Sequence, residues 1–399
     1  MRTNTKYLLY FSFIFTLISC EQPKSSNDSI DFSNINSEHI LNLSSLYDSI
    51  KYVKLETSSN SLIGSIKKVI PFNKQFFIFD EEYSNIFIFD DEGKFIKKIG
   101  NQGTGPNEYV KYEDICFDTK SNRLFALDNT RNRIQTFDKN GNFLYNIELK
   151  FFTGEIKYLS EDIIVCYNDF KMNHNLKKGN KNPLVTLINA NNGEILSNEI
   201  YISSKIESEE VISPYFATST DGSEVILFDV LRSTIYVYNE RHNRKEYVLN
   251  FGAEDTRKRE IYYSKLQDKD LNVYDVCIGC KEEPNFVMIT SAFKESDNLF
   301  VFATDYTRKI QYFIKYNLLS NHYIYTKTSK FSPFINDIDN GFSILLPNTI
   351  ENNKVYGSIN ASLLEYCDRS KITNDNLLSI MNNTNEEDNP ILFIATLKK

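Results

Sequence analysis

The chain has 399 residues and a formal charge of −8, and 41% of its residues are hydrophobic. This acidic balance repels a phosphate backbone and therefore argues against nucleic-acid binding. The hydrophobic content is sufficient for a large core, and the 25 Tyr and 30 Phe residues favour strands, where aromatic rings pack well on a pleated surface.

The first 19 residues have the pattern of a signal peptide. Arg2 and Lys6 precede an apolar run at 7–18 that is too short to span a bilayer as a mature helix. The run ends in Leu-Ile-Ser-Cys at 17–20, which resembles a bacterial lipobox. That resemblance implies that Cys20 becomes the first residue of the mature protein and carries acyl chains that anchor it to a membrane. An ordinary cleaved signal peptide with a chance cysteine is the alternative.

A polar segment, residues 20–49, follows and is expected to form a flexible tether. The segment 52–56, YVKLE, then alternates between apolar and polar residues as a strand does. We predict one folded domain over residues 50–399.

An internal repeat indicates the architecture of this domain. The spacing that separates Asp80 from Asp128 also separates Gly93 from Gly141 and Phe95 from Phe143. A repeat of this length, made of short apolar runs divided by Asn, Asp and Gly, is typical of a β-propeller blade.

The repeat predicts an all-β fold, a six-bladed β-propeller of four-stranded antiparallel blades. The blades are expected at about 62–99, 113–149, 155–202, 212–251, 286–326 and from 343 to 396. The last blade has only three strands of its own, so we predict that the N-terminal strand at 52–56 supplies the fourth and closes the ring. Five or seven blades are the alternative counts.

Three segments interrupt the repeat. They are 170–183, 252–285 with a helix-like stretch at 256–268, and 360–390 with an expected helix at 361–368. Each follows the second or the fourth strand of a blade, so all three are expected on one face of the disc. Binding residues concentrate on loops held by a rigid scaffold, and this face is therefore the predicted ligand-binding face.

A Gly-rich segment, GNQGTGPNEY at 100–109, is followed by Asp118 and by DNTRNRIQTF at 128–137. This pattern resembles the NHL-type blade signature. Together with the lipobox and the YVKLE start, it makes the chain similar to the six-bladed propeller lipoproteins of Gram-negative gut anaerobes. The resemblance implies a lipid-anchored protein of the cell envelope, at the outer membrane, on its periplasmic or its outer side.

Several polar residues are candidates for ligand binding because they recur at or near the ends of second strands or lie in an insertion. They are Asp80, Asp128, Arg131, Asn132, Asp229, Asp305, Arg308 and His174. The aspartates could form a ring of carboxylates around the channel mouth that binds a cation or sugar hydroxyls. Alternatively, each aspartate binds the backbone amides of its own turn.

Cys277 and Cys280 have the spacing of a redox pair or of half a zinc site. No second cysteine pair and no histidine cluster accompanies them in the sequence. A local disulfide, two inert thiols and a metal site are the alternatives.

Only four histidines are present, and they are scattered along the chain. They do not form a pattern that general acid–base catalysis usually needs. We therefore expect a non-catalytic module that binds a glycan, a peptide or an envelope protein, without a cofactor. The alternative is a cation-dependent hydrolase or lyase of the gluconolactonase type, which would hold calcium in its channel.

Overall fold

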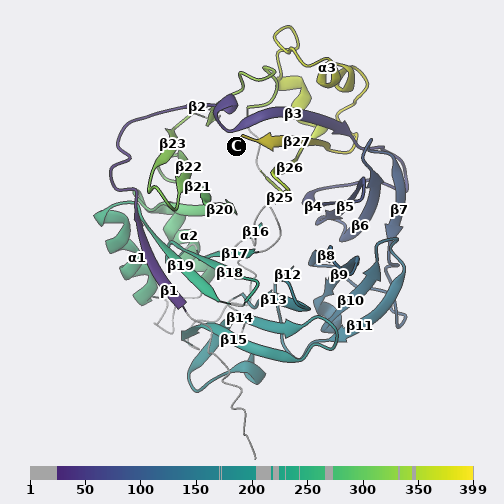
Figure 1. The fold of residues 1–399 in the computed structure, drawn as a ribbon, viewed down its shortest axis with the longest axis vertical. Helices are drawn as coiled ribbons and strands as arrows, with labels where there is room; N and C mark the ends of the chain where they lie inside the picture. The colour runs from purple at the N-terminus through teal and green to yellow at the C-terminus, as the bar shows by residue number, and fades with distance from the viewer. Residues whose placement is uncertain are drawn as a thin grey trace, which may run out of the picture.

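The computed structural model describes residues 25–398 apart from 170, 172, 204–216, 219–223, 230, 242, 266–272, 331–332 and 344–346. Six sheets surround a central axis, and we count the strands of each blade outward from the one nearest that axis (Figure 1). The predicted all-β, six-bladed propeller is confirmed.

The first three blades agree with the predicted repeat. Blade one contains β4 (Ile66–Phe72), β5 (Gln75–Asp80), β6 (Asn85–Asp90) and β7 (Phe95–Ile99). Blade two contains β8 (Asp114–Asp118), β9 (Arg123–Asp128), β10 (Arg133–Asp138) and β11 (Phe143–Glu148), with the short helix η2 (Asn129–Arg131) between β9 and β10. Blade three contains β12 (Glu155–Tyr158), β13 (Ile163–Tyr167), β14 (Lys181–Asn189) and β15 (Ile195–Ser203).

The other three blades are less regular. Blade four contains β16 (Ala217–Thr218), β17 (Glu224–Asp229), β18 (Thr234–Asn239) and β19 (Arg244–Asn250). Blade five contains β20 (Met288–Glu295), β21 (Asn298–Asp305), β22 (Ile310–Asn317) and β23 (Tyr323–Thr328). Blade six contains β25 (Thr349–Glu351), β26 (Lys354–Ile359), β27 (Ile391–Leu397) and the N-terminal β3 (Tyr47–Lys54).

The ring closes as predicted, because β3 pairs with β27 in antiparallel register, with Lys54 opposite Ile391. The closing strand begins earlier than the expected 52–56 and ends at Lys54. Both ends of the propeller therefore meet in blade six, and the backbone hydrogen bonds of one sheet hold the ring shut.

The segment expected to be a flexible tether is ordered from residue 25, so that expectation is wrong for residues 25–49. β1 (Ser25–Asp31) is a fifth strand of blade four and runs parallel to β19, with Ser25 opposite Arg244. Ile30 and Phe32 are only 3% and 2% exposed. These two apolar side chains and the free edge of β19 outweigh the polar composition of the segment.

The chain between β1 and β3 is also tied to the propeller. β2 (Leu41–Asn42) pairs in parallel with β24 (Phe334–Ile335), and η1 (Leu43–Ser45) leads into β3. The signal peptide and Cys20 lie outside the described residues, so lipidation remains a prediction.

The buried hydrophobic residues of the described chain form six clusters, one between each pair of neighbouring blades. Phe77 and Phe79 of blade one, for example, pack with Ile115 and Phe137 of blade two. Each fully buried side chain of this size contributes roughly 1.5–3 kcal/mol. The packing of blade against blade therefore stabilises the ring as a whole.

The Asn140-Gly141 turn joins β10 to β11 in blade two, and an Asn-Gly pair often forms a tight hairpin turn in which both residues have positive φ. Only Gly141 has positive φ, at 72°, and a Cβ atom there would lie 2.9 Å from Ile99. The pairing of β10 with β11 shifts register between Thr136 and Phe137, so the turn is longer and contains a bulge.

Neighbouring strands of a blade are antiparallel, so the second and fourth strands end on the same side of the disc. We call this side the insertion face, because the segments after β13, β19 and β26 leave from it. The other side carries the turns from first to second and from third to fourth strands, and we call it the turn face.

The insertions contain more helix than expected. α1 (Ala253–Lys265) corresponds to the predicted stretch, whereas α2 (Val273–Glu282) and α3 (Asp375–Asn382) were not predicted. The helix expected at 361–368 is the 3-10 helix η4 (Ala361–Tyr366), and η3 (His174–Leu176) lies in the first insertion.

Each insertion packs on a connection between blades. In α1, Arg259 donates to the carbonyl oxygen of Leu231 at 3.2 Å, while Asp255 accepts from the amide of Val287 at 2.8 Å, so the helix joins blades four and five. Asn173 of the first insertion binds the backbone of Phe152 at 2.7 and 3.0 Å. The insertions thus cover the crossovers of this face.

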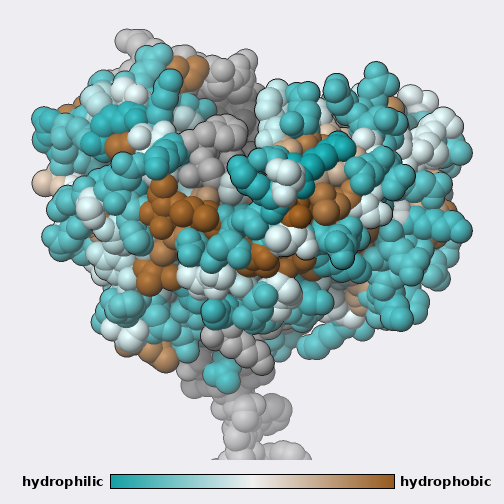
Figure 2. Space-filling model, turned by 90° about the horizontal axis from the view of Figure 1, so that it is seen from above, coloured by the Kyte–Doolittle hydropathy of each residue, from teal (hydrophilic) through white to brown (hydrophobic). Residues whose placement is uncertain are grey.

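The rim beside blade six is mostly hydrophilic, and its hydrophobic side chains form small separate groups (Figure 2). None of the helices in the described ranges is long and apolar enough to cross a membrane.

Candidate binding site at the mouth of the central channel

The central channel carries a buried ion pair that links three blades. The ammonium of Lys68 on β4 lies 2.6 Å from Oδ2 of Asp114 on β8, and the two residues are 4% and 0% exposed. The same oxygen accepts from the amide of Ile156 on β12 at 2.9 Å. Because the two opposite charges are in contact and Asp114 also accepts from a backbone amide, this pair can persist away from water.

A second set of charges lies nearer the insertion face. Lys67 is 3.7 Å from Glu155 and 3.7 Å from Glu81, and it donates to the carbonyl oxygen of Glu113 at 3.2 Å. Burial raises the pKa of Glu113 to about 7, although the amide of Asn129 opposes the shift. Charged side chains therefore lie on the inner strands both at the middle of the ring and toward the insertion face.

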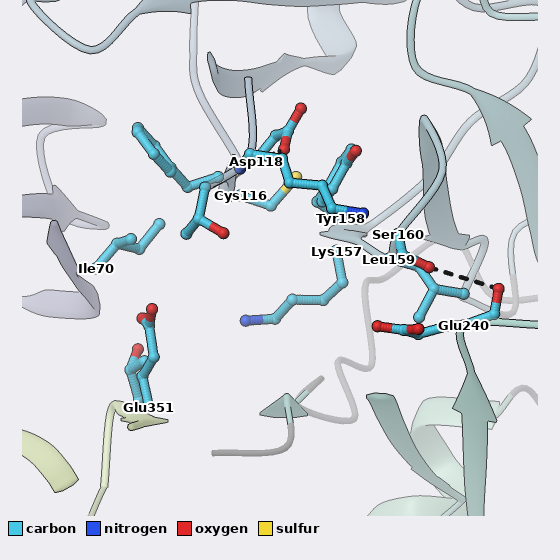
Figure 3. Close-up of a pocket in the computed structure, with 13 residues that line it drawn as sticks. Ile70, Cys116, Asp118, Lys157, Tyr158, Leu159, Ser160, Glu240 and Glu351 are labelled. Atoms are coloured by element: carbon cyan, nitrogen blue, oxygen red, sulfur yellow. Dashed lines mark hydrogen bonds between the residues drawn. The ribbon is translucent and has the colours of Figure 1, made fainter. Parts of the chain in front are cut away.

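On the other side of the Lys68–Asp114 pair, a pocket of about 220 Å³ opens at the turn face. The residues that line it come from four inner strands and from the turns beside them (Figure 3). They are Ile70, Cys116, Phe117, Asp118, Thr119, Lys120, Lys157, Tyr158, Leu159, Ser160, Glu240, Thr349 and Glu351. The pocket is the mouth of the channel on the face opposite the insertions.

Lys157, on β12, points into this pocket (Figure 3) and is only 8% exposed. Its ammonium makes no hydrogen bond or ion pair with any residue that the structure describes. Burial lowers the pKa of Lys157 to about 8, and the charge of Lys68 lowers it further, whereas Asp114 opposes the shift. A buried ammonium without a partner is unfavourable in a protein unless a ligand or water satisfies it.

Glu351, at the end of β25, points toward Lys157 from the opposite wall (Figure 3). Burial raises the pKa of Glu351 to about 7, and the charge of Lys157 partly offsets that shift. No ion pair joins the two side chains across the cavity. A positive and an ionisable acidic group therefore face one another with space between them.

The rim of the pocket is held by charge pairs and by a backbone contact. Asp118 lies 3.0 Å from Arg123, which also lies 2.6 Å from Asp162 in the next blade. The hydroxyl of Ser160 donates to the carbonyl oxygen of Glu240 at 3.5 Å, so blades three and four meet at the rim. Because Arg123 neutralises Asp118, Lys157 and Glu351 are the inner charges that remain available to a ligand.

The structure does not bring the four predicted aspartates together. Each lies at the end of the second strand of a different blade and is at most 9% exposed. Asp80 accepts from the amide of Ser65 at 3.0 Å, and Asp305 accepts from the amide of Asn285 at 2.8 Å. Asp229 accepts from two amides of its own turn, at 3.0 Å each.

Asp128 accepts from the amide of Val110 at 3.3 Å and lies 3.6 Å from Arg133. Asp305 also lies 2.6 Å from Arg308. These contacts favour the alternative in which the aspartates bind backbone amides, of their own turns or of the preceding crossover. Among the described residues, no group of three or more His, Cys, Asp or Glu could hold a metal ion.

The residues that resemble the NHL signature hold the Gly-rich crossover. Arg131 donates to the carbonyl oxygen of Gly105 at 2.7 Å, and Arg133 donates to those of Pro106 and Glu108 at 2.6 and 2.5 Å. Asn132 follows η2 in the left-handed region, with φ of 50°. The motif thus fixes the chain that connects blade one to blade two.

The remaining candidates are scattered. His174 is exposed in η3 on the insertion face, away from the pocket. Cys277 and Cys280 both lie in α2, and Cys280 is 1% exposed. The side chain of Cys277 lies outside what the structure describes, so a disulfide between them remains a prediction.

Sequence reasoning missed the pocket residues Lys157 and Glu351. The available signal was a charged residue within a short inner strand, in EIKY at 155–158 and TIE at 349–351. A charge in a strand that the fold encloses has few places to point except the channel. The sequence could not show which two of the inner strands would face one another.

Residues 27–396 match the model of a protein family described only as a domain of unknown function. The chain is similar in structure to a protein of Bacteroides fragilis NCTC 9343 assigned as exported, with 17% identity and a TM-score of 0.70 over 94% of this chain and 100% of that one. It is also similar to a member of the DUF4221 family from Bacteroides vulgatus ATCC 8482, with 12% identity and a TM-score of 0.50 over 88% and 97% of the two chains. These likenesses show the fold alone. No curated protein matches the sequence.

Proposed function

The chain belongs to the DUF4934 family, and from that premise we propose a membrane-anchored, non-catalytic binding protein of the cell envelope that takes a small polar ligand into its central pocket. The observation that carries this proposal is Lys157, a residue that is 8% exposed, whose ammonium points into the cavity and has no partner among the described residues. An anionic group of a ligand would supply the missing partner and offset the cost of burial.

The size of the pocket supports a small ligand. Its volume of about 220 Å³ is below the ~300 Å³ at which sites for drug-sized molecules begin. A long glycan or a folded protein could not enter it. Such a larger partner would use the insertion face instead, as expected from the sequence.

The lining favours binding over catalysis. Among the residues that the structure describes, the lining contains no histidine, and burial raises the pKa of the Cys116 thiol to about 12. A thiol is nucleophilic only as the thiolate, so Cys116 is unreactive at neutral pH. Lys157 and Glu351 are placed to hold charged groups of a ligand from opposite walls of the pocket.

The proposed location rests on the signal peptide and on Cys20, which would carry the lipid. The related fold of a protein assigned as exported supports export of this chain as well. We place the protein at the outer membrane, on its periplasmic or its outer side.

The test is a thermal-shift screen of the mature chain, with its propeller intact, against single amino acids, sugar acids, neutral sugars and small organic acids. We expect at least one compound to raise the Tm of the wild type without changing the Tm of Lys157→Met. Lys120→Met is the matched control, because Lys120 lines the same pocket but is exposed. If no compound distinguishes the wild type from Lys157→Met, the proposal fails.

A further inference from the structure

The two inner charges of the pocket come from opposite sides of the ring. Lys157 belongs to the inner strand of blade three and Glu351 to the inner strand of blade six, and their side chains point toward one another (Figure 3). No contact closes the gap between them. A ligand that lies in the gap meets a positive group at one end and a carboxyl group at the other.

This arrangement disfavours ligands that carry one sign of charge only. A polyanion would meet Glu351 and, at the rim, Glu240. A polycation would meet Lys157 and, behind it, Lys68, whose charge already lowers the pKa of Lys157. Like charges at short range in a partly dry site cost more than they would in water.

We propose that the pocket binds a small zwitterion, with a carboxylate of the ligand against Lys157 and an ammonium against Glu351. This inference rests on the proposed function and names its ligand class. A free α-amino acid is the simplest molecule with both groups, and it is small enough for a cavity of about 220 Å³.

The remaining wall accommodates an apolar side chain. Ile70, Phe117 and Leu159 line the pocket beside the two charges. Burial of one methylene group of a ligand against such a wall tightens binding about fourfold. Amino acids with aliphatic side chains are therefore expected to bind more tightly than glycine.

Binding of a zwitterion should also release protons to the solvent or take them up, depending on the pH. The pKa of Glu351 is raised to about 7, and an ammonium beside it would lower that value, so binding near pH 6.5 releases protons. The pKa of Lys157 is lowered to about 8, and a carboxylate beside it would raise that value, so binding near pH 8.5 takes protons up. A neutral ligand would do neither.

Titration calorimetry of the mature protein with each of the twenty standard amino acids provides the test. For the tightest binder, the analogue without the amino group and the analogue without the carboxyl group are titrated next. We expect each analogue to bind at least tenfold more weakly than the amino acid. Lys157→Met and Glu351→Gln should each lose at least tenfold in affinity. Glu92→Gln, which changes an exposed carboxylate of the turn face that does not line the pocket, should change the affinity less than threefold.

Repeating the titration in buffers of different ionisation enthalpy gives the number of protons exchanged. The release of protons near pH 6.5 should disappear in Glu351→Gln. A variant that lost binding through misfolding would be recognised by its lowered Tm. If glucuronate or lactate binds as tightly as any amino acid and depends on Lys157, the zwitterion inference is wrong while the proposed function stands. If no probe binds in a Lys157-dependent way, both fail.

Discussion

Lys157 is held in a position that weakens the fold, and a bound ligand would compensate for it. Its pKa is about 8 in the folded chain against 10.5 for the free side chain. Below pH 8 the ammonium is charged in both states, so the folded state bears the full cost of burying it. As pH rises from about 8 toward 10.5, the folded chain releases its proton first and the cost disappears.

We therefore expect Lys157→Met to raise the free energy of unfolding by ~1–3 kcal/mol at pH 6.5, and by less at pH 9.5. Urea unfolding at the two pH values measures the difference. The exposed Lys120→Met should change stability by less than ~0.5 kcal/mol at both. A loss of stability in Lys157→Met at pH 6.5 would mean that the ammonium has a partner in the folded protein.

The contribution of Glu351 to stability changes with pH in the direction opposite to that of Lys157. Its pKa is raised from 4.5 to about 7, so the folded state binds the proton more tightly, and the contribution of this residue to stability falls as pH rises through that range. Near neutral pH both side chains are thus close to titration. This agrees with a site whose charge adjusts to its ligand.

At the scale of the strand and its connection, the aspartates at the ends of second strands bind backbone amides that would otherwise lack a partner. Asp128 is the clearest case, because its carboxylate binds the amide of Val110 and lies beside Arg133. Arg131 and Arg133 then hold the carbonyl oxygens of the same crossover. The 100–109 segment is thereby fixed without regular secondary structure of its own.

Asp128→Ala should lower the free energy of unfolding by ~2–4 kcal/mol, because it removes the acceptor of the half-buried Val110 amide and the carboxylate that lies beside the buried guanidinium of Arg133. Chemical denaturation measures the loss, and Asp48→Ala is the control, since Asp48 is exposed on β3. Millimolar calcium should not change the Tm of either protein. A calcium-dependent rise in the wild type that Asp128→Ala abolishes would support the cation-dependent alternative instead.

β1 forms a strand because of the strand beside it and not because of its own sequence. Its sequence, SSNDSID, is polar and has low strand propensity. It pairs because β19 presents a free edge and because Ile30 and Phe32 fill the cluster between blades four and five. The strand also protects that edge from pairing with another chain.

For the molecule as a whole, the direction of β1 decides where the membrane would lie. Ser25 pairs with Arg244, at the turn-face end of blade four. Five steps of extended chain from Cys20 to Ser25 span at most roughly 17 Å. A lipid on Cys20 would therefore keep the turn-face rim of blade four near the bilayer, with blade one on the far side of the ring.

Fluorophores attached at Arg241→Cys in blade four and at Lys94→Cys in blade one can test this orientation. Both residues are exposed and lie in equivalent turns of the turn face. On vesicles that carry spin-labelled lipid, we expect stronger quenching of the blade-four fluorophore. Equal quenching at the two sites would contradict the prediction, and a 20-residue Gly/Ser linker inserted after residue 22 should abolish any difference. The unsubstituted protein controls for labelling of its own cysteines.

Much of this architecture is encoded locally and could be read from the chain. The repeat of apolar runs and Asn-, Asp- and Gly-containing turns determines six blades, and the missing strand of the last blade determines closure by β3. Both depend on short-range patterning, which survives in a single sequence. The positions of the three insertions follow from the same pattern, although α2 and α3 do not.

The formation of β1 and the assembly of the pocket depend on the tertiary structure and could not be predicted from the sequence. β1 depends on an edge made by residues far away in the chain, and its own sequence favours no structure. Lys157 and Glu351 likewise lie on blades three and six, and nothing near either residue indicates that the other faces it. Closure of the ring brings them together, because it directs every inner strand to one axis, and the unpaired charge at that axis is what identifies the candidate site.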